Sequence, residues 1–572
     1  MLELQGPRKI ALGELLRDLF SQAPNRVSGA TLLPIRMTPN IGDICRISPD
    51  SREKGNRTAL RLLRPDFSVQ TWTFGEMDSL ANQFANVLLE IGEGEGSTIA
   101  ILLPKCVEVY YGFLGILKTR STVLPLFANF GDMALVDRLA DSQATCVLTK
   151  RSMAKRLQNL RGNLPSLRTL LLVDIDEDLG PDLLSLPARI GRASSTCQSQ
   201  PAEEDTPSLL HYTSGSTGKP KGVLHTHGGL PHLRRTAEEI LGFEPDDRYW
   251  CTADHGWITG TSYGLIAPWY LGITQVQFTG MYDPETWFRI LEEEAVSVWY
   301  TAPTALRMLM RVEDMDFSRY DLSRLRSIFS VGEPLNPEIS RWGTEVLGHD
   351  IHDTWFQTET GGIMIANRPG LAIRPGSMGK PLSTIAASIL DDQGNPCPPR
   401  TVGRLCLRYP WPSMFRAYLN RDEQYRARFS GTHYDSGDLA YQDKDGYFWF
   451  VARNDDVINT SGHLVSPFEI ESALLEMPEV AEAATVGVPD PILFEGIVVF
   501  VALRQHVEKN DELAMKIRLY VANRLSAVAT PKDVVFVDSI PKNKSGKILR
   551  RVLRARYLGQ DPGDISSIED NP

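Results

Sequence analysis

The sequence predicts an α/β protein with more than one domain, and three observations support this. The chain has 572 residues, which is more than one hydrophobic core usually organises. Between residues 70 and 332, helical patterns alternate with short apolar runs, as in a wound α/β architecture. From about residue 376 to 452, short apolar segments are separated by turn residues, which indicates a β-rich subdomain.

The wound region can be assigned element by element. Apolar side chains recur at helical spacing over residues 74–91, which predicts a helix. Short apolar runs predict strands over 98–103, 123–126, 169–173, 275–278, 296–299 and 327–331. Residues 180–206 carry proline, serine and acidic residues without periodicity, so we expect a surface connection there.

The end of the chain predicts a second, smaller α+β domain. Residues 391–394 and 443–446 have the composition of turns, and a helix is predicted over 467–475. The most apolar span, 483–503, contains prolines and acidic residues, so we expect two core strands and a turn rather than a membrane helix. We divide the chain into domains 1–452 and 453–572.

Composition excludes several classes of protein. A net charge of −11 disfavours nucleic-acid binding, which requires a basic face. The seven cysteines are odd in number and form no Cys-x-x-Cys pair, so neither a disulfide framework nor a zinc site is indicated. The first residues lack a secretory signal pattern, and we expect a cytoplasmic protein without a membrane span.

The segment 212–227 has the composition of a loop that binds a triphosphate. Glycines allow tight turns that bring backbone N–H groups to an anion, while hydroxyls donate hydrogen bonds and lysines add positive charge. The candidate ligand residues are Thr213, Ser214, Gly215, Ser216, Thr217, Gly218, Lys219 and Lys221. A serine- and glycine-rich stretch alone is more often a linker. The lysines, a predicted strand over 208–212 and a following helix favour the phosphate loop, which is not a Walker loop.

Four further blocks occur downstream in a recognisable order: 330–337, 353–362, 434–438 with 453–456, and 541–547. With these blocks the chain resembles the adenylate-forming superfamily, which contains acyl-CoA synthetases, luciferase and the adenylation domains of peptide synthetases. The resemblance covers residues 50–555. Around residues 250–260 it is closest to AMP-forming acetyl-CoA synthetases.

The resemblance implies ATP, Mg²⁺ and CoA as cofactors and a carboxylate as substrate. Lys547 resembles the lysine that bridges the carboxylate and the α-phosphate, and Thr358 would contact that phosphate. Glu359 matches the metal-associated glutamate, because a hard cation prefers oxygen ligands. A capping or salt-bridged role is the alternative for Glu359.

The nucleoside site is implied in the same way. Asp438 would hold both ribose hydroxyls, with Arg453 as its partner, although an isolated Gly-Asp pair is usually a plain turn. The residues that resemble the adenine slot are Gly332, Glu333, Pro334, Asp353, Thr354 and Trp355. Core packing is the alternative for Trp355.

The small domain is implied to be mobile, with Asp455 at the hinge and Gly462 lining the channel for CoA. Some relatives have a basic residue at the position of Leu464, so no phosphate contact is implied there. The cations around Lys547 are expected to form a solvated face; they are Lys542, Lys544, Arg550, Arg551, Arg554 and Arg556. Related synthetases also imply a lysine acetyltransferase and deacetylase that act on Lys547.

The acyl pocket is implied to comprise Trp257, Ile258, Thr259, Val331 and Phe356, all of which would also suit an ordinary core. Acetate-specific relatives place tryptophan at position 356 and medium-chain relatives glycine, so Phe356 favours short acids, acetate or propionate first. Branched, alicyclic or medium-chain acids remain the alternative. Two alternatives also remain for the function of the whole protein. It could load a carrier protein as an adenylation enzyme or, third, act as a non-catalytic nucleotide-binding scaffold.

Overall fold

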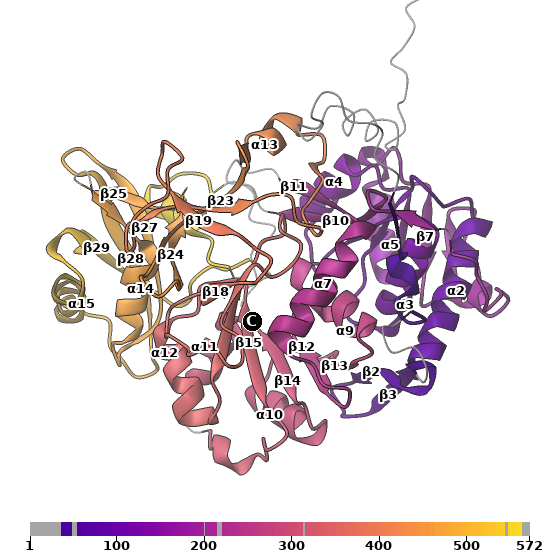
Figure 1. Cartoon of the computed structure of the whole chain (residues 1–572), viewed down its shortest axis with the longest axis horizontal. Coiled ribbons are helices and arrows are strands. Elements are labelled where there is room, and N and C mark those ends of the chain that lie inside the picture. Colours follow the sequence, from indigo (N-terminus) through magenta and orange to yellow (C-terminus); the bar gives the residue numbers. More distant parts are fainter. Residues whose placement is uncertain are drawn as a thin grey trace, which may run out of the picture.

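The computed structural model describes residues 36–47, 54–199, 201–213, 220–312, 315–454, 456–460, 463–543 and 547–562. They form a large body of two sheets, a small β-rich sheet and a C-terminal unit at one side (Figure 1). The predicted α/β class, with a β-rich subdomain and a small C-terminal α+β unit, is confirmed.

The first sheet has eight strands in the order β21-β11-β10-β5-β4-β6-β7-β8. Its strands are β4 (Thr98–Ile101), β5 (Thr122–Pro125), β6 (Cys146–Thr149), β7 (Thr169–Leu172), β8 (Leu183–Ser185), β10 (Pro207–Thr213), β11 (Lys221–Thr226) and β21 (Ala417–Tyr418). Strands β4 to β8 and β10 run parallel, whereas β11 pairs antiparallel with β10 and β21. The β10–β11 hairpin thus carries the predicted phosphate loop at its tip.

The second sheet has nine strands in the order β18-β17-β16-β15-β14-β12-β13-β2-β3. They are β2 (Thr58–Leu63), β3 (Val69–Thr73), β12 (Arg248–Cys251), β13 (Thr274–Phe278), β14 (Val298–Thr301), β15 (Ser327–Val331), β16 (Ile351–Trp355), β17 (Ile365–Ala366) and β18 (Lys380–Pro381). The central strands are parallel and buried, as their continuous apolar runs require. The carboxyl ends of β15 and β16 carry the candidate adenine residues.

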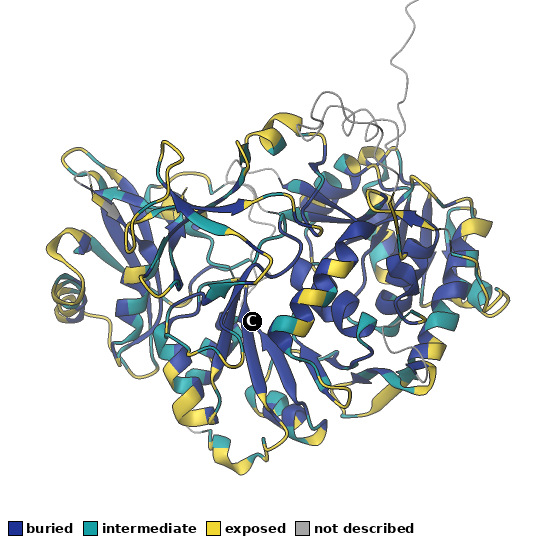
Figure 2. Ribbon diagram, in the orientation of Figure 1, coloured by how far each residue is buried: buried dark blue, intermediate teal, exposed yellow. Residues whose placement is uncertain are grey.

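The two sheets and the helices between them share one apolar core. Buried residues run through both sheets (Figure 2). The predicted helix 74–91 is α2 (Phe74–Glu90), whose N-terminus is fixed by a reciprocal capping box between Thr73 and Glu76. The other helices of the large body are α3 (Val107–Lys118), α4 (Asp132–Asp141), α5 (Arg151–Asn159), α6 (Leu186–Ile190), α7 (Leu230–Thr236), α8 (Ile258–Thr261), α9 (Ala267–Tyr270), α10 (Pro284–Glu293), α11 (Pro303–Met310), α12 (Pro337–Trp342) and α13 (Asp422–Arg426). The strand predictions within 98–331 are confirmed to within two residues at their starts.

The β-rich subdomain consists of β19 (Ala387–Leu390), β20 (Gly403–Arg408), β22 (Phe429–Ser430), β23 (His433–Gln442) and β24 (Phe448–Arg453). Both predicted turns are present. Gly394 and Gly446 have φ of 84° and 86°, a region that favours glycine, and each N–H donates to the carbonyl three residues earlier. The long strand β23 brings Asp438 toward the large sheets.

The C-terminal unit has its own sheet and core. Its elements are β25 (Ile458–Thr460), β26 (His463–Val465), α14 (Pro467–Leu475), β27 (Val480–Asp490), β28 (Phe494–Leu503), α15 (Asp511–Arg524), β29 (Asp533–Val537) and α16 (Arg550–Tyr557). The predicted helix 467–475 and the two core strands within 483–503 are confirmed. The boundary at residue 452 remains a prediction.

One fold prediction was wrong. Residues 180–206 are not merely a surface connection, because they contain β8, α6 and the short strand β9 (Ala202–Glu203), which pairs with β1 (Met37–Thr38). Strand β8 adds to the edge of the eight-stranded sheet, and Leu184 and Ser185 are buried. Such a short strand has too few residues to show periodicity, and pairing with β7 stabilises it.

Two expectations from composition can be compared with the described residues. All seven cysteines are free. Among the described helices, none combines the length and apolarity that crossing a bilayer would require.

Candidate active site

A cavity of about 190 Å³ lies between the large body and the C-terminal unit. The sequence-predicted residues that line it are Gly332, Glu333, Pro334, Asp353, Thr354, Trp355, Phe356, Asp438, Arg453 and Lys547. They come from the ends of β15 and β16, from β23 and β24, and from the loop before α16. Segments far apart in the sequence therefore meet at one cavity.

The two carboxylate oxygens of Asp438 have partners of different kinds. Its Oδ2 accepts hydrogen bonds from Trp355 Nε1 and Gln357 Nε2, both at 3.0 Å. Its Oδ1 forms an ion pair with Arg453 Nε at 3.2 Å but accepts no hydrogen bond from the residues described. Burial raises the pKa of Asp438, opposed by Arg453. A buried carboxylate in the lining of a cavity suits a ribose hydroxyl.

Gln357 was missed by sequence analysis, although it directly precedes Thr358 in the same block. It also accepts a hydrogen bond from the Tyr434 hydroxyl at 2.9 Å, which fixes its orientation. Trp355 is half-buried and packs on the core, so the alternative of core packing holds in part. Its indole N–H also orients Asp438.

The loop after β16 places Thr358 and Glu359 beside the first sheet. The Thr358 carbonyl accepts a 2.7 Å hydrogen bond from His225 Nε2, and burial lowers the pKa of His225 to about 4. The Tyr418 hydroxyl donates to Glu359 Oε1 at 2.6 Å. Burial, and then Glu359, raise the pKa of Tyr418 far above its usual value, so the hydroxyl keeps its proton. Glu359 is thus held by a neutral donor.

Lys221 lies close to this carboxylate. Its Nζ is 5.3 Å from the centroid of the Tyr418 ring, which is within cation–π range. Burial, and then Arg428, lower the pKa of Lys221. Thr213 pairs with Lys221 across the β10–β11 hairpin, so both ends of the phosphate loop are fixed. Ser214, Gly215, Ser216, Thr217, Gly218 and Lys219 lie outside the described residues.

Lys547 enters the cavity from the C-terminal unit. The backbone N–H of Lys547 donates to Asn543 Oδ1 at 2.9 Å, and the backbone N–H of Asn543 donates to the Lys547 carbonyl at 2.8 Å. Burial, and then Arg453, lower the pKa of Lys547, while Asp456 and Asp438 oppose them. The ammonium therefore lies within electrostatic reach of the Asp438–Arg453 pair.

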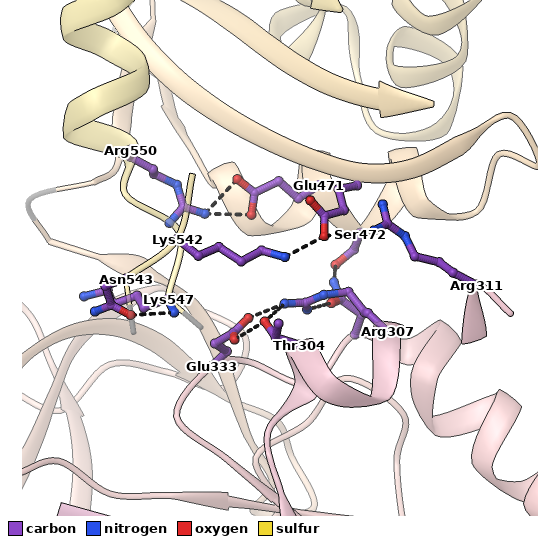
Figure 3. A network of polar contacts seen from close by, with 12 residues as sticks. Thr304, Arg307, Arg311, Glu333, Glu471, Ser472, Lys542, Asn543, Lys547 and Arg550 are labelled. Atoms are coloured by element: carbon purple, nitrogen blue, oxygen red, sulfur yellow. Dashed lines mark hydrogen bonds and ion pairs between the residues drawn. The ribbon is translucent and has the colours of Figure 1, made fainter. Parts of the chain in front are cut away.

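The expectation that the other cations form a solvated face was wrong for Lys542 and Arg550. The Lys542 side chain is 11% exposed and pairs with Glu482. The Arg550 side chain is 18% exposed and pairs with Glu471 (Figure 3). Arg551, Arg554 and Arg556 are exposed, as expected, and Lys544 lies outside the described residues. The partner carboxylates come from distant elements, which the local sequence does not show.

Of the candidate acyl residues, Trp257 contacts Gly332 and Phe356 lines the cavity. A Cβ at Gly332, whose φ is 96°, would come within 2.3 Å of the Trp257 ring, so the indole lies directly against this glycine. Phe356 borders the cavity and packs edge-on against Tyr263, with ring centroids 5.4 Å apart. Ile258, Thr259 and Val331 are buried, as an ordinary core would also require. The pocket assignment stays a prediction.

Magnesium fits this site through one protein carboxylate. The described residues contain no group of three or more His, Cys, Asp or Glu side chains that could hold a metal ion by themselves. Glu359 would supply one oxygen, and phosphate oxygens and waters the others, as is usual for Mg²⁺. Asp455 and Gly462 lie outside the described residues, as does the side chain of Leu464.

Comparison with known proteins identifies the class to which this fold and site belong. Residues 49–419 match the model of the AMP-binding enzyme family, and residues 469–547 match the model of the AMP-binding enzyme C-terminal domain. The chain belongs to the AMP-binding enzyme family.

Particular relatives narrow the class. The chain is 44% identical to an acetyl-coenzyme A synthetase of Bacillus subtilis over 503 residues, which is 88% of each protein. It is 39% identical to an acetyl-coenzyme A synthetase of Pasteurella multocida, covering 91% of this chain and 84% of that one. Among solved structures, an anthranilate CoA ligase in complex with anthranoyl-AMP matches with a TM-score of 0.83 and 29% identity, covering 92% and 98% of the two chains.

Proposed function

We propose that this protein is an AMP-forming acyl-CoA synthetase. It activates a short-chain carboxylate with ATP through an acyl-adenylate and then transfers the acyl group to CoA. The observation that carries the proposal is the meeting of Lys547 with Asp438 and Arg453 at one cavity. Identities of 36–44% to proteins named acetyl-coenzyme A synthetase support the reaction class.

Each residue has a separate task in the first half-reaction. Asp438 Oδ1 accepts a ribose hydroxyl, and the ends of β15 and β16 bind the base. Lys547 places positive charge where the carboxylate attacks the α-phosphate, a step that depends on positioning and electrostatics. Thr358 contacts the same phosphate. Glu359 would hold Mg²⁺, which would supply positive charge to offset that of the phosphates.

The second half-reaction needs a channel for CoA and exclusion of water. We assign Gly462 to this channel and Asp455 to the hinge between domains 1–452 and 453–572. Access of CoA to the adenylate then requires the C-terminal domain to move, because Lys547 enters the cavity from that side.

Acetate or propionate is the preferred acid in this proposal. Phe356 lines the cavity and is smaller than tryptophan, so it leaves more space for an acyl chain than tryptophan would. Trp257 lies against Gly332, which is another lining residue. A larger branched, alicyclic or medium-chain acid is the second candidate. The smaller size of Phe356 relative to tryptophan also favours this second candidate. Two structural neighbours are named as CoA ligases for anthranilate and benzoate. Each methylene contributes about 1–3 kcal/mol of discrimination.

An AMP-release screen over C2 to C8 acids tests the function. With ATP, Mg²⁺ and CoA but no carrier protein, AMP and acyl-CoA should form in equal amounts, with the highest kcat/KM for C2 or C3. A hexanoate kcat/KM equal to that for propionate would favour the second candidate. AMP release that requires a carrier protein would instead indicate the adenylation enzyme. Absence of AMP with every acid would leave only a binding scaffold.

Two further parts of the proposal concern the cell. We infer a cytoplasmic enzyme, in keeping with seven free cysteines. We also infer that a lysine acetyltransferase and a deacetylase act on Lys547, because neutralising this charge would stop adenylation. Mass spectrometry of protein purified from its host, with and without deacetylase, would detect the modification. Unmodified Lys547 under both conditions would contradict the inference that an acetyltransferase and a deacetylase act on it.

A further inference from the structure

Beside the nucleotide cavity, charged side chains of both domains meet where α11 faces the C-terminal unit (Figure 3). Glu482, on β27, contacts Ile540 and Lys542, which precede Lys547 in the chain. Its Oε1 lies 2.5 Å from Lys542 Nζ, and its Oε2 accepts the Ile540 N–H at 3.3 Å. The side chain of Glu482 is 9% exposed. One buried carboxylate thus organises two points of this segment.

Arg311, at the end of α11, makes the contact across the domain boundary. Its Nη1 lies 3.2 Å from the same Glu482 Oε1 that binds Lys542. Burial raises the pKa of Glu482, but Lys542 and Arg311 outweigh it, so the carboxylate stays ionised. Glu482 is therefore shared by one cation from each domain.

A second contact links the same surfaces to the cavity. Asn336 Nδ2 donates to Ser472 Oγ of α14 at 2.8 Å, and Asn336 Oδ1 accepts from Arg307 Nη1 at 3.1 Å. Arg307 in turn pairs with Glu333, which lines the cavity. Docking of the C-terminal unit is thereby connected to the residues around the nucleotide site.

We propose that the Arg311–Glu482 ion pair is a latch that holds the C-terminal domain in the arrangement where Lys547 lies beside Asp438. Arg311 and Glu482 are positioning residues that act through Lys547. The consequence for rate rests on the function proposed above, whereas the consequence for domain position does not.

The shared carboxylate makes the latch reversible. When the C-terminal domain moves away, Lys542 and the Ile540 N–H move with Glu482, so the carboxylate keeps partners and is not left as an unpaired buried charge. Arg311 is 31% exposed and gains water. The latch can therefore open without the penalty that usually follows the loss of one member of a buried pair.

The test compares Arg311→Gln with a matched control, Arg326→Gln. Arg326 pairs with Asp247 inside the large domain, and its side chain has the same 31% exposure. In Arg311→Gln, Glu482 keeps Lys542 as a partner, and in Arg326→Gln, Asp247 keeps Ser297. Trace acetylation of Lys547 by acetic anhydride, read by mass spectrometry on nucleotide-free full-length protein, measures how often the domain moves away.

We expect Lys547 in Arg311→Gln to react about tenfold faster than in wild type, within the range typical of coupling between contacting groups. Arg311→Lys should recover part of the protection, and Arg326→Gln should match wild type. The ratio of ATP/pyrophosphate exchange to thioester formation from supplied acyl-adenylate should fall in Arg311→Gln.

The outcomes separate this inference from the proposed function. Lys547 reactivity in Arg311→Gln equal to wild type, or raised equally by Arg326→Gln, would overturn the latch. Lys547 reactivity could rise in Arg311→Gln alone while wild type shows no pyrophosphate exchange. That result would support the latch and contradict the proposed function. Raised reactivity with an unchanged ratio of half-reactions in an active enzyme would reject the positioning role.

Discussion

Asp438 and Arg453 lie opposite each other on the adjacent strands β23 and β24, with Arg453 Nε 3.2 Å from Asp438 Oδ1. The pairing is part of the sheet register, so the backbone itself aligns the carboxylate with its cation. Because Trp355 and Gln357 donate to Oδ2, the side chain, which lines the cavity, has a fixed orientation.

Asp438→Asn should raise the KM for ATP by about 10- to 100-fold, since a hydrogen bond to a charged group contributes about 1.5–3 kcal/mol. The KM for the carboxylate should change little. Steady-state kinetics would check this, with Asp435→Asn as control. Asp435 is on the same strand and pairs with Arg404 outside the cavity lining. Equal effects of both substitutions would contradict the ribose role.

Lys547→Ala should slow adenylation by about 10²–10³, the cost of losing a positioned transition-state donor. Thioester formation from supplied acyl-adenylate should continue, because the ammonium acts on the departing and attacking groups of the first step. ATP/pyrophosphate exchange measures the first half-reaction. Near-normal ATP/pyrophosphate exchange in this variant would contradict a role for Lys547 in adenylation.

Tyr418→Phe should weaken magnesium binding and leave folding intact. The substitution removes the hydroxyl that donates to Glu359 Oε1 but keeps the ring that Lys221 faces. We expect the Mg²⁺ concentration for half-maximal exchange to rise by about tenfold, equivalent to one hydrogen bond of about 1.4 kcal/mol. Tyr409→Phe, which loses a bond to the Gly431 carbonyl at 2.8 Å, is the control. An unchanged Mg²⁺ requirement would argue against Tyr418 as an orienting group.

Phe356→Trp should narrow the acid range and Phe356→Gly should widen it. The side chain borders the cavity, so a larger ring removes space that the acyl chain needs. We expect kcat/KM for propionate relative to acetate to fall by about 10- to 100-fold in Phe356→Trp, in line with about 1–3 kcal/mol per methylene. A ratio that does not move in either variant would place the acyl group elsewhere.

Asp353→Asn should remove part of the pH dependence of stability. Burial raises the pKa of Asp353 from 3.8 to about 7, so between these pH values the folded protein holds a proton that the unfolded chain has lost. The stabilisation from this proton is complete below about pH 4 and is lost as pH rises through 7. Urea unfolding of wild type and variant at pH 4 to 8 measures the difference. A stability difference that is constant over this range would contradict the raised pKa.

The sequence by itself determined the position of most long elements and the residue types of the candidate site. Periodicity located α2, β13, β14 and β15, since these elements are long or apolar enough to show their pattern. Glycine fixed the turns at 391–394 and 443–446, where the backbone requires positive φ. Local order along the chain is sufficient for such features.

Only the tertiary structure decided how those residues are paired. Trp355 and Asp438 are 83 residues apart and Lys542 and Glu482 60 residues apart, yet each pair forms a hydrogen bond. A basic run looks solvated when its carboxylates are distant in sequence, and a three-residue strand such as β8 exists because β7 pairs with it. Burial and partner choice follow from packing between segments, which the order of residues does not display.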